Sequence, residues 1–359
     1  MAFDWPNSTY LHYNGTNSKG THICRAEYLN CDTVQFYYKF ENISHFNVIA
    51  VATFNFIVSP FTTFFNFLAL YTIYRRRKLQ TLSNLILCNL ALTDFLTGCL
   101  TQPFFGVLML MSAFCVKFCF INTFTIIVGN LLSSVSMASL FLITLDRHLS
   151  IFYPFYYEKV KDNKQKLLIM IIGLWISNLG LVCAGLATPD MLVSAIGSSA
   201  FAALIFTWSL YVNIKTALVV RRIQRDIAAH TVSNEPYTNT RNRGRSEVSS
   251  RVTRVAFTIL ASMFICYLPF VGFALIEMRF QSPFNAWVWI STLVFLNSTI
   301  NPLVYCWQMR EIREEMKVII NKIFCCRTIE IWRDRFSTTA QARSTIMPAA
   351  SMRASSMPL

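Results

Sequence analysis

Charged residues are scarce in this sequence of 359 residues. Asp, Glu, Lys and Arg together make up only 14% of the chain, whereas hydrophobic residues make up 54%. A typical soluble domain is about 25% charged. The charges also occur in short blocks and leave long uncharged runs, which can satisfy their backbone polar groups in lipid only as helices. The composition therefore predicts an integral membrane protein.

The motifs of common enzymes are missing as well. The chain has no internal repeat, no G-x-G-x-x-G or other glycine-rich phosphate loop, no zinc-type Cys/His spacing and no H-E-x-x-H. We therefore expect neither an enzyme nor a bound cofactor. The net charge of +14 does not indicate nucleic acid, because the basic residues collect in alternate connections between the apolar runs.

Seven apolar runs of about 20 residues or more are each sufficient to span a bilayer. They cover Phe46 to Tyr74, Leu82 to Met111, Phe118 to Leu145, Leu167 to Leu186, Met191 to Val220, Val255 to Ile276 and Ala286 to Trp307. The sequence thus predicts an all-α membrane protein with a bundle of seven transmembrane helices. Lys215 and Asp94 are the ionisable residues well inside these runs.

The distribution of Lys and Arg predicts the orientation of the bundle. Of 32 such residues, only five lie on the first segment or in the even-numbered loops: Lys19, Arg25, Lys39, Lys117 and Arg279. Because positive residues are retained on the cytoplasmic side, the N-terminus is expected outside the plasma membrane and the C-terminus in the cytoplasm. Asn7, Asn14 and Asn42 agree, since each begins an Asn-x-Ser/Thr glycosylation triplet in the outer tail.

We divide the chain into four parts. Residues 1–45 form the glycosylated outer tail, 46–308 the seven-helix domain, 309–326 an amphipathic helix on the membrane surface, and 327–359 a disordered cytoplasmic tail. The connection from about Ile223 to Ser250 is polar, basic and expected to be flexible. Cys325 and Cys326 end the amphipathic helix and are candidates for S-palmitoylation or free thiols.

The remaining cysteines fall into two groups. Those within the apolar runs are interpreted as small buried residues: Cys88, Cys99, Cys183, Cys266 and Cys306. Those on the outer side could form disulfides whose pairing the sequence leaves open: Cys24, Cys31, Cys115 and Cys119.

Asp94 is the sharpest functional signal. It lies twelve residues after Leu82 and therefore roughly 18 Å along its helix, near the middle of the membrane. An unpaired carboxylate there costs about 2.5 kcal/mol or more, so a partner, water or an ion must compensate it. Such a residue also marks the ion pathways of transporters and channels, which are the main alternative class.

Several motifs distinguish between these classes. Asn66 and the stretch from Asn84 to Asp94 lie on the first and second helices, and Asp146-Arg147-His148 follows the third run, with Ile151, Pro154 and Tyr157 after it. Trp175, Tyr211, the stretch Cys266 to Pro269 and Asn301-Pro302-Leu303-Val304-Tyr305 mark the last four helices. Together they resemble the conserved markers of rhodopsin-like G-protein-coupled receptors, and the order of the markers matches that family.

The resemblance implies a role for each group of residues. Those for G-protein coupling and activation are Asp146, Arg147, His148, Tyr211, Asn301, Pro302 and Tyr305, and those for the conformational switch are Tyr267 and Pro269. A sodium-ion pocket would comprise Asp94, Ser136, Asn297 and Asn301. The implied partners are an extracellular ligand, membrane lipids and a heterotrimeric G protein, with arrestin as a further candidate.

The sequence also departs from the family pattern. Tyr267 replaces a tryptophan and Ala203 a proline, and Met137 and Met263 occupy two packing positions near the switch. Ser249 replaces the acidic residue that would lock Arg147, so raised basal activity is expected. The fifth helix lacks its usual proline, and the outer loop near Pro189 is short. In these two features the sequence loosely resembles the branch of melanocortin, adenosine, cannabinoid and lysophospholipid receptors.

The expected ligand pocket is mostly apolar. Gly129 replaces the third-helix aspartate that pairs with amines, and Phe295 replaces the lysine that links retinal. Candidate lining residues, which could equally face lipid or pack internally, are Phe104, Phe105, Phe270, Phe273, Trp287 and Trp289. These positions favour a lipid or another hydrophobic ligand slightly, while a peptide remains an alternative.

Overall fold

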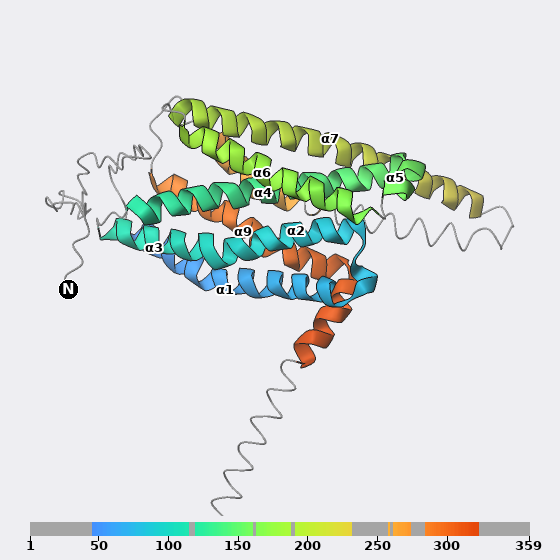
Figure 1. The fold of residues 1–359 in the computed structure, drawn as a ribbon, viewed down its shortest axis with the longest axis horizontal. Helices are drawn as coiled ribbons and strands as arrows, with labels where there is room; N and C mark the ends of the chain where they lie inside the picture. Colours follow the sequence, from blue (N-terminus) through green and yellow to red (C-terminus); the bar gives the residue numbers. More distant parts are fainter. Residues whose placement is uncertain are drawn as a thin grey trace, which may run out of the picture.

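Apolar runs of the sequence form long helices that lie side by side along one common direction (Figure 1). The computed structural model describes residues 45–114, 119–160, 163–187, 191–231, 258, 261–273 and 284–322. Within this part of the chain nearly every residue is helical and there is no strand. The prediction of an all-α transmembrane bundle is therefore confirmed.

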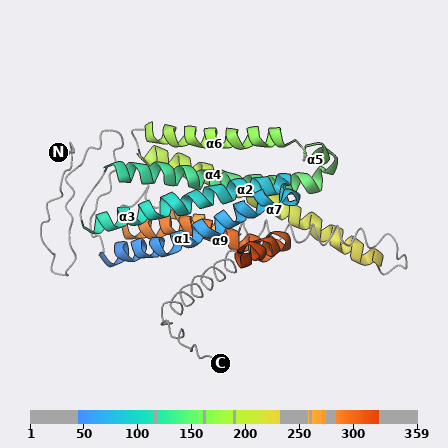
Figure 2. The same ribbon diagram turned by 60° about the horizontal axis from the view of Figure 1, so that its bottom comes forward.

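Six of the helices or helical runs are long and apolar enough to cross a membrane. They lie in α1 (His45–Arg75), the run Leu82–Ala113, α4 (Cys119–Phe152), α6 (Lys164–Ala187), α7 (Met191–Thr231) and α9 (Phe284–Gln308). A shorter apolar helix, Ala261–Phe273, is the described part of the sixth predicted span. The helices α7 and α1 lie on opposite sides of the bundle with α4 between them (Figure 1), and α6 lies along the outside (Figure 2).

The second span contains a local irregularity. It begins with α2 (Leu82–Leu96), capped by Thr81, and continues through η2 (Thr97–Thr101), a π-helical turn, into α3 (Gln102–Ala113). Pro103 stands in the first turn of α3 and has no N–H to donate to a carbonyl of the preceding η2 turn, which is consistent with an irregular helix at this point. The extra residue of a π-turn shifts the faces of the helix, so η2 sets which side chains of α3 point into the bundle.

Two helices extend further than the apolar runs indicate. The helix α4 ends at Phe152 rather than near Leu145, so Asp146 and Arg147 lie within a helix. The helix α7 ends at Thr231, so residues 223–231, which were expected to be flexible, are helical instead. Hydropathy marks only the part of a helix that contacts lipid or core, and a helix of charged residues can continue into water.

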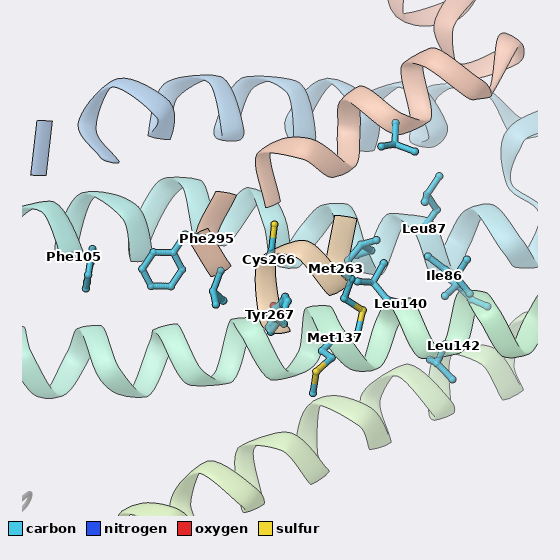
Figure 3. Packing of buried hydrophobic residues seen from close by; sticks show 14 of the residues in the cluster. Ile86, Leu87, Phe105, Met137, Leu140, Leu142, Met263, Cys266, Tyr267 and Phe295 are labelled. Carbon is cyan, nitrogen blue, oxygen red and sulfur yellow. The ribbon is translucent and has the colours of Figure 1, made fainter. Parts of the chain in front are cut away.

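A core of buried apolar side chains follows the long axis of the bundle. Phe105 and Phe295 lie toward one end, Met263, Tyr267 and Met137 in the middle, and Ile86 and Leu87 toward the other end (Figure 3). The outward faces instead carry exposed large apolar residues, among them Ile57, Phe61, Leu168, Ile176 and Leu204. Such faces are expected where lipid replaces water as the solvent.

One end of the bundle carries the short connecting elements. The turn η1 (Arg77–Leu79), the helix α5 (Pro154–Val160), the end of α7 and the helix 310–322 gather there (Figure 1). In the helix 310–322, the side chains of Ile312, Met316 and Ile319 belong to the hydrophobic core. An ion pair between Arg76 and Glu315, with Nε and Oε2 2.7 Å apart, also joins it to the first connection.

The cysteines of the spans are free thiols, although they are not equally buried. Cys266 is buried and Cys88, Cys99 and Cys306 are partly buried, as expected for small residues within a bundle. Cys183 is exposed on the outer face of α6, so its interpretation as a buried residue is wrong. The helix positions alone could not distinguish a lipid-facing cysteine from an internal one.

Candidate functional site

Asp94 lies at the centre of a polar cluster inside the bundle. Its side chain is fully buried on α2. Its carboxylate accepts a hydrogen bond from Asn301 Nδ2 of α9 at 2.8 Å and another from Ser136 Oγ of α4 at 3.3 Å. The structure thus brings together three of the four residues expected to form the sodium pocket.

Several polar atoms near this cluster lack protein partners. Asn297, one turn before Asn301 on α9, is fully buried, and neither its Oδ1 nor its Nδ2 makes a hydrogen bond within the described residues. Asn301 Oδ1 is unpaired in the same sense. Buried amides are rarely left unsatisfied, because each unpaired group costs about 1–3 kcal/mol. These oxygen atoms beside a carboxylate are suited to a small cation or to ordered water.

The first and last spans are joined by a series of polar contacts. Asn66 Nδ2 donates to the Ser298 carbonyl at 3.0 Å, and the Thr62 and Thr299 hydroxyls lie 2.6 Å apart. Further along α1, Asn55 Nδ2 donates to Thr292 Oγ1 at 3.1 Å. These bonds hold the α9 segment that carries Asn297 and Asn301 against α1.

A second polar contact joins three other helices. Asn89 of α2 accepts a hydrogen bond from Trp175 Nε1 of α6 at 2.9 Å and donates one to Ser139 Oγ of α4 at 2.8 Å. Asn89 lies just over one turn from Asp94, so this contact fixes α2 on the side away from α9. Trp175 therefore packs α6 against α2, and we assign it no part in ligand binding.

The carboxylate of Asp146 lies at the end of the bundle that carries the connections. It accepts hydrogen bonds from Ser83 Oγ at 2.7 Å and from the Tyr157 hydroxyl at 2.9 Å, and Arg147 Nε lies 3.6 Å from it. Tyr157 was identified only as part of the following loop, and Ser83 was missed. A serine in the first turn of a helix is usually a surface or capping residue, so the sequence carried no signal for this role.

Tyr157 belongs to α5 and holds that short helix against α4. Burial, and next the negative charge of Asp146, raise the pKa of the Tyr157 phenol above its ordinary value. The phenol therefore stays protonated and donates to the carboxylate. This bond positions α5, on which the Phe155 side chain is 88% exposed.

The other residues assigned to coupling are not all brought together. His148 stacks on Phe152, with ring centroids 4.2 Å apart. The Tyr211 side chain is 49% exposed on α7 and contacts Trp208 and Lys215, and no contact within the described residues joins it to Arg147. Pro302 lies buried in α9, and Tyr305 follows on the same helix, although its side chain is outside the described part.

The residues assigned to the switch lie in the middle of the core. The buried Tyr267 donates from its hydroxyl to the Ser133 carbonyl of α4 at 3.3 Å and packs edge-on against Phe206. Met263 and Met137 are buried nearby (Figure 3). Pro269, two residues after Tyr267, is half-buried. The Tyr267 hydroxyl thus adds a polar contact with α4 in the middle of the apolar core.

An aromatic cluster occupies the other end of the bundle. Phe105 is buried and lies edge-on to Phe295 and Trp287, with centroid distances of 5.2 and 5.9 Å. A Cβ added at Gly129 would meet Thr101 Cγ2 at 3.3 Å and the Phe295 ring at 4.0 Å. Trp289, by contrast, is 41% exposed and donates to Asn47 Oδ1 at 3.4 Å.

Several assigned residues lie outside the described part of the chain. These are the glycosylation positions Asn7, Asn14 and Asn42, the acylation positions Cys325 and Cys326, the outer cysteines Cys24, Cys31 and Cys115, and Ser249. Cys119 begins α4, and its side chain is likewise not described.

The arrangement is that of a multi-span membrane protein with a buried carboxylate and a charged cluster at one end. A family model described as the 7 transmembrane receptor (rhodopsin family) matches residues 65–194. This match covers the helices that carry Asp94, Ser136, Asp146 and Arg147.

Relatives among known proteins agree with the family model. The chain is 25% identical to the Tachykinin-like peptides receptor 86C of Drosophila melanogaster over 76% of its own length. It is 22% identical to Trace amine-associated receptor 4 of Mus musculus over 71%, and 28% identical to Melanocortin receptor 5 of Homo sapiens over 55%. The matches span 58%, 80% and 58% of these three relatives. The chain is therefore similar to the rhodopsin-like family of seven-transmembrane receptors.

Proposed function

We propose that this protein is a plasma-membrane receptor that binds an extracellular ligand and activates heterotrimeric G proteins. The observation that carries the proposal is the pairing of Asp146 and Arg147 at the end of α4, beside α5. This end would face the cytoplasm, because the basic connections are expected there. The outer tail, residues 1–45, would then lie outside the cell.

The cytoplasmic surface has the chemistry of a protein-binding site. The Arg147 side chain is 22% exposed and retains donors that Asp146 does not engage. Phe155 is almost fully exposed on α5, held in place by the bond between Tyr157 and Asp146. Partly buried guanidinium groups and exposed aromatic rings are among the anchors that contribute most to protein interfaces. Arrestin is a second candidate partner for this surface.

The ligand we propose is a lipid or another hydrophobic small molecule. The cluster of Phe105, Trp287 and Phe295 supports this choice, because it makes the interior of its half of the bundle apolar. Gly129 has no side chain that could pair with an amine, and its neighbours Thr101 and Phe295 carry no carboxylate either. The relatives are named as receptors for tachykinin-like peptides and trace amines, which makes peptides and amines the controls for a ligand screen.

We also propose a sodium ion beside Asp94 in the inactive receptor. The fully buried carboxylate and the unpaired oxygens of Asn297 and Asn301 fit a hard cation, which prefers oxygen ligands. Ser136 would complete the set. A cation that prefers the inactive state must lower the affinity for agonists, because binding to the two sites is linked.

Nucleotide exchange on a purified G protein tests the proposed function. The full-length receptor is reconstituted in bilayers, and lipid, peptide and amine libraries are screened for compounds that accelerate exchange. The proposal expects a hydrophobic compound that raises the exchange rate with wild-type receptor but not with empty bilayers. Substrate or ion flux through the protein without any effect on exchange would instead identify a transporter or channel.

A further inference from the structure

The exposed face of α7 carries a lysine within the membrane span. Lys215 belongs to the span Ala200–Arg222, and its side chain is exposed. Counting 1.5 Å per residue, it lies roughly 10 Å along the axis before Arg222. A lysine at this depth is costly unless its ammonium reaches the headgroup region or meets an opposite charge.

The protein provides no opposite charge for this lysine within the described residues. The ammonium lies 4.7 Å above the ring of Tyr211, which is exposed one turn away on α7. The charge of Lys215 also acts on the imidazole of His148 on α4, which is not an anion. The exposed neighbours Ile214 and Leu218 are apolar. The described residues around Lys215 therefore carry no negative charge.

The same face continues toward the middle of the membrane as an aromatic surface. Trp208 is exposed one turn before Tyr211, and their ring centroids are 6.0 Å apart. Trp208, Tyr211 and Lys215 thus form a stripe of two rings and one ammonium at helical spacing, which we term the α7 stripe. The stripe has apolar rings at the end nearer the middle of the membrane and a positive charge at the other end.

We propose that the α7 stripe binds an anionic phospholipid of the cytoplasmic leaflet. Lys215 reaches toward the headgroup region and pairs with the phosphate or another anionic group of the head, while the rings of Tyr211 and Trp208, which lie deeper in the membrane, contact an acyl chain. The lipid is the partner that fits, because the face lies within a membrane span, and only the lipid brings both an anion and a hydrocarbon chain. The choice of leaflet rests on the orientation proposed above.

Native mass spectrometry of the full-length receptor in detergent micelles tests this site. Phosphatidylserine and phosphatidylcholine are added separately at equal concentrations, and the bound lipids are counted. We expect the wild-type receptor to bind one molecule of phosphatidylserine at this site, and to bind it more tightly than phosphatidylcholine. Lys215→Gln should lower the affinity for phosphatidylserine about fivefold, the effect of one lysine near an anionic surface. Lys215→Arg keeps the positive charge and should therefore retain the wild-type affinity for phosphatidylserine.

A matched control separates a specific site from general attraction. Lys166→Gln removes the same charge from an exposed lysine at the start of α6 and should bind both lipids as the wild type does. The proposal is wrong if Lys215→Gln binds phosphatidylserine as well as wild type, if both glutamine variants lose affinity equally, or if wild-type receptor does not discriminate between the lipids. A receptor dimer lost in Lys215→Gln without a change in lipid binding would assign the stripe to a second copy instead. Lipid counting needs no G protein, so its failure is distinct from failure of the proposed function.

Discussion

Arg147 differs from its neighbour Asp146 because it is neither fully buried nor fully paired. Its partner Asp146 already accepts hydrogen bonds from Ser83 and Tyr157, so the contact with Arg147 Nε at 3.6 Å is a secondary one. Breaking it costs little, since Asp146 keeps its other partners. The guanidinium is thus available to an incoming protein.

Arg147→Ala should therefore remove ligand-stimulated nucleotide exchange while leaving the amount of receptor at the cell surface close to wild type. The measurement is exchange on a purified G protein, together with surface labelling of intact cells. Lys166→Ala serves as a charge-matched control and should signal normally. Wild-type exchange rates from Arg147→Ala would contradict the proposed role.

The sodium ion that we propose beside Asp94 would stabilise the folded receptor. A ligand that binds only the folded state stabilises it by RT ln(1 + [L]/Kd), about 1.4 kcal/mol at ten times its Kd. The Tm of the purified receptor should rise when sodium chloride replaces N-methylglucamine chloride at constant ionic strength. Asp94→Asn should remove the dependence on sodium. Equal Tm values of the wild type in both salts would rule out the ion and favour ordered water.

At the scale of elements, α1 and η2 approach each other closely at Gly98. Ser59 Oγ donates to the Gly98 carbonyl at 2.8 Å, and a Cβ at Gly98 would meet Thr63 Oγ1 at 2.7 Å and the Thr63 backbone nitrogen at 2.8 Å. The hydroxyl could rotate away, but the backbone nitrogen could not. Only glycine permits α1 to approach the π-turn this closely.

Gly98→Ala should consequently destabilise the receptor by about 1–3 kcal/mol, the usual cost of overpacking. The matched control is Gly180→Ala on α6, where an added Cβ has no neighbour within 4 Å. The Tm of each variant in detergent measures the effect, and only Gly98→Ala should lower it. A wild-type Tm for Gly98→Ala would mean that the helices separate at no cost.

At the scale of the whole molecule, the orientation determines which end of the bundle meets the ligand. Three glycosylation triplets and the scarcity of Lys and Arg in the outer segments predict the N-terminus outside. An epitope at the N-terminus should be labelled on intact cells, and one at the C-terminus only after permeabilisation. Endoglycosidase should also increase the electrophoretic mobility, an effect lost on replacing Asn7, Asn14 and Asn42 by Gln. Labelling of the C-terminus on intact cells would reverse the orientation.

The amino-acid sequence by itself determined the long apolar helices and the position of a carboxylate in the middle of one of them. These features depend on local rules: an uncharged run must become a helix in lipid, and a carboxylate at its middle needs compensation wherever it lies. The grouping of Asn301 and Ser136 with Asp94 came instead from the family resemblance, and the structure brings both side chains to the Asp94 carboxylate.

Only the tertiary structure decided which helices meet and at which residues. Ser83 reaches Asp146 because α2 and α4 lie side by side, and Tyr157 reaches it because α5 folds back as a helix rather than a loop. Tyr211 points outward to Lys215 instead of toward Arg147 because of the rotation of α7 about its axis. Rotation and contact between helices depend on packing between residues far apart in the sequence, and hydropathy within one segment carries no information about them.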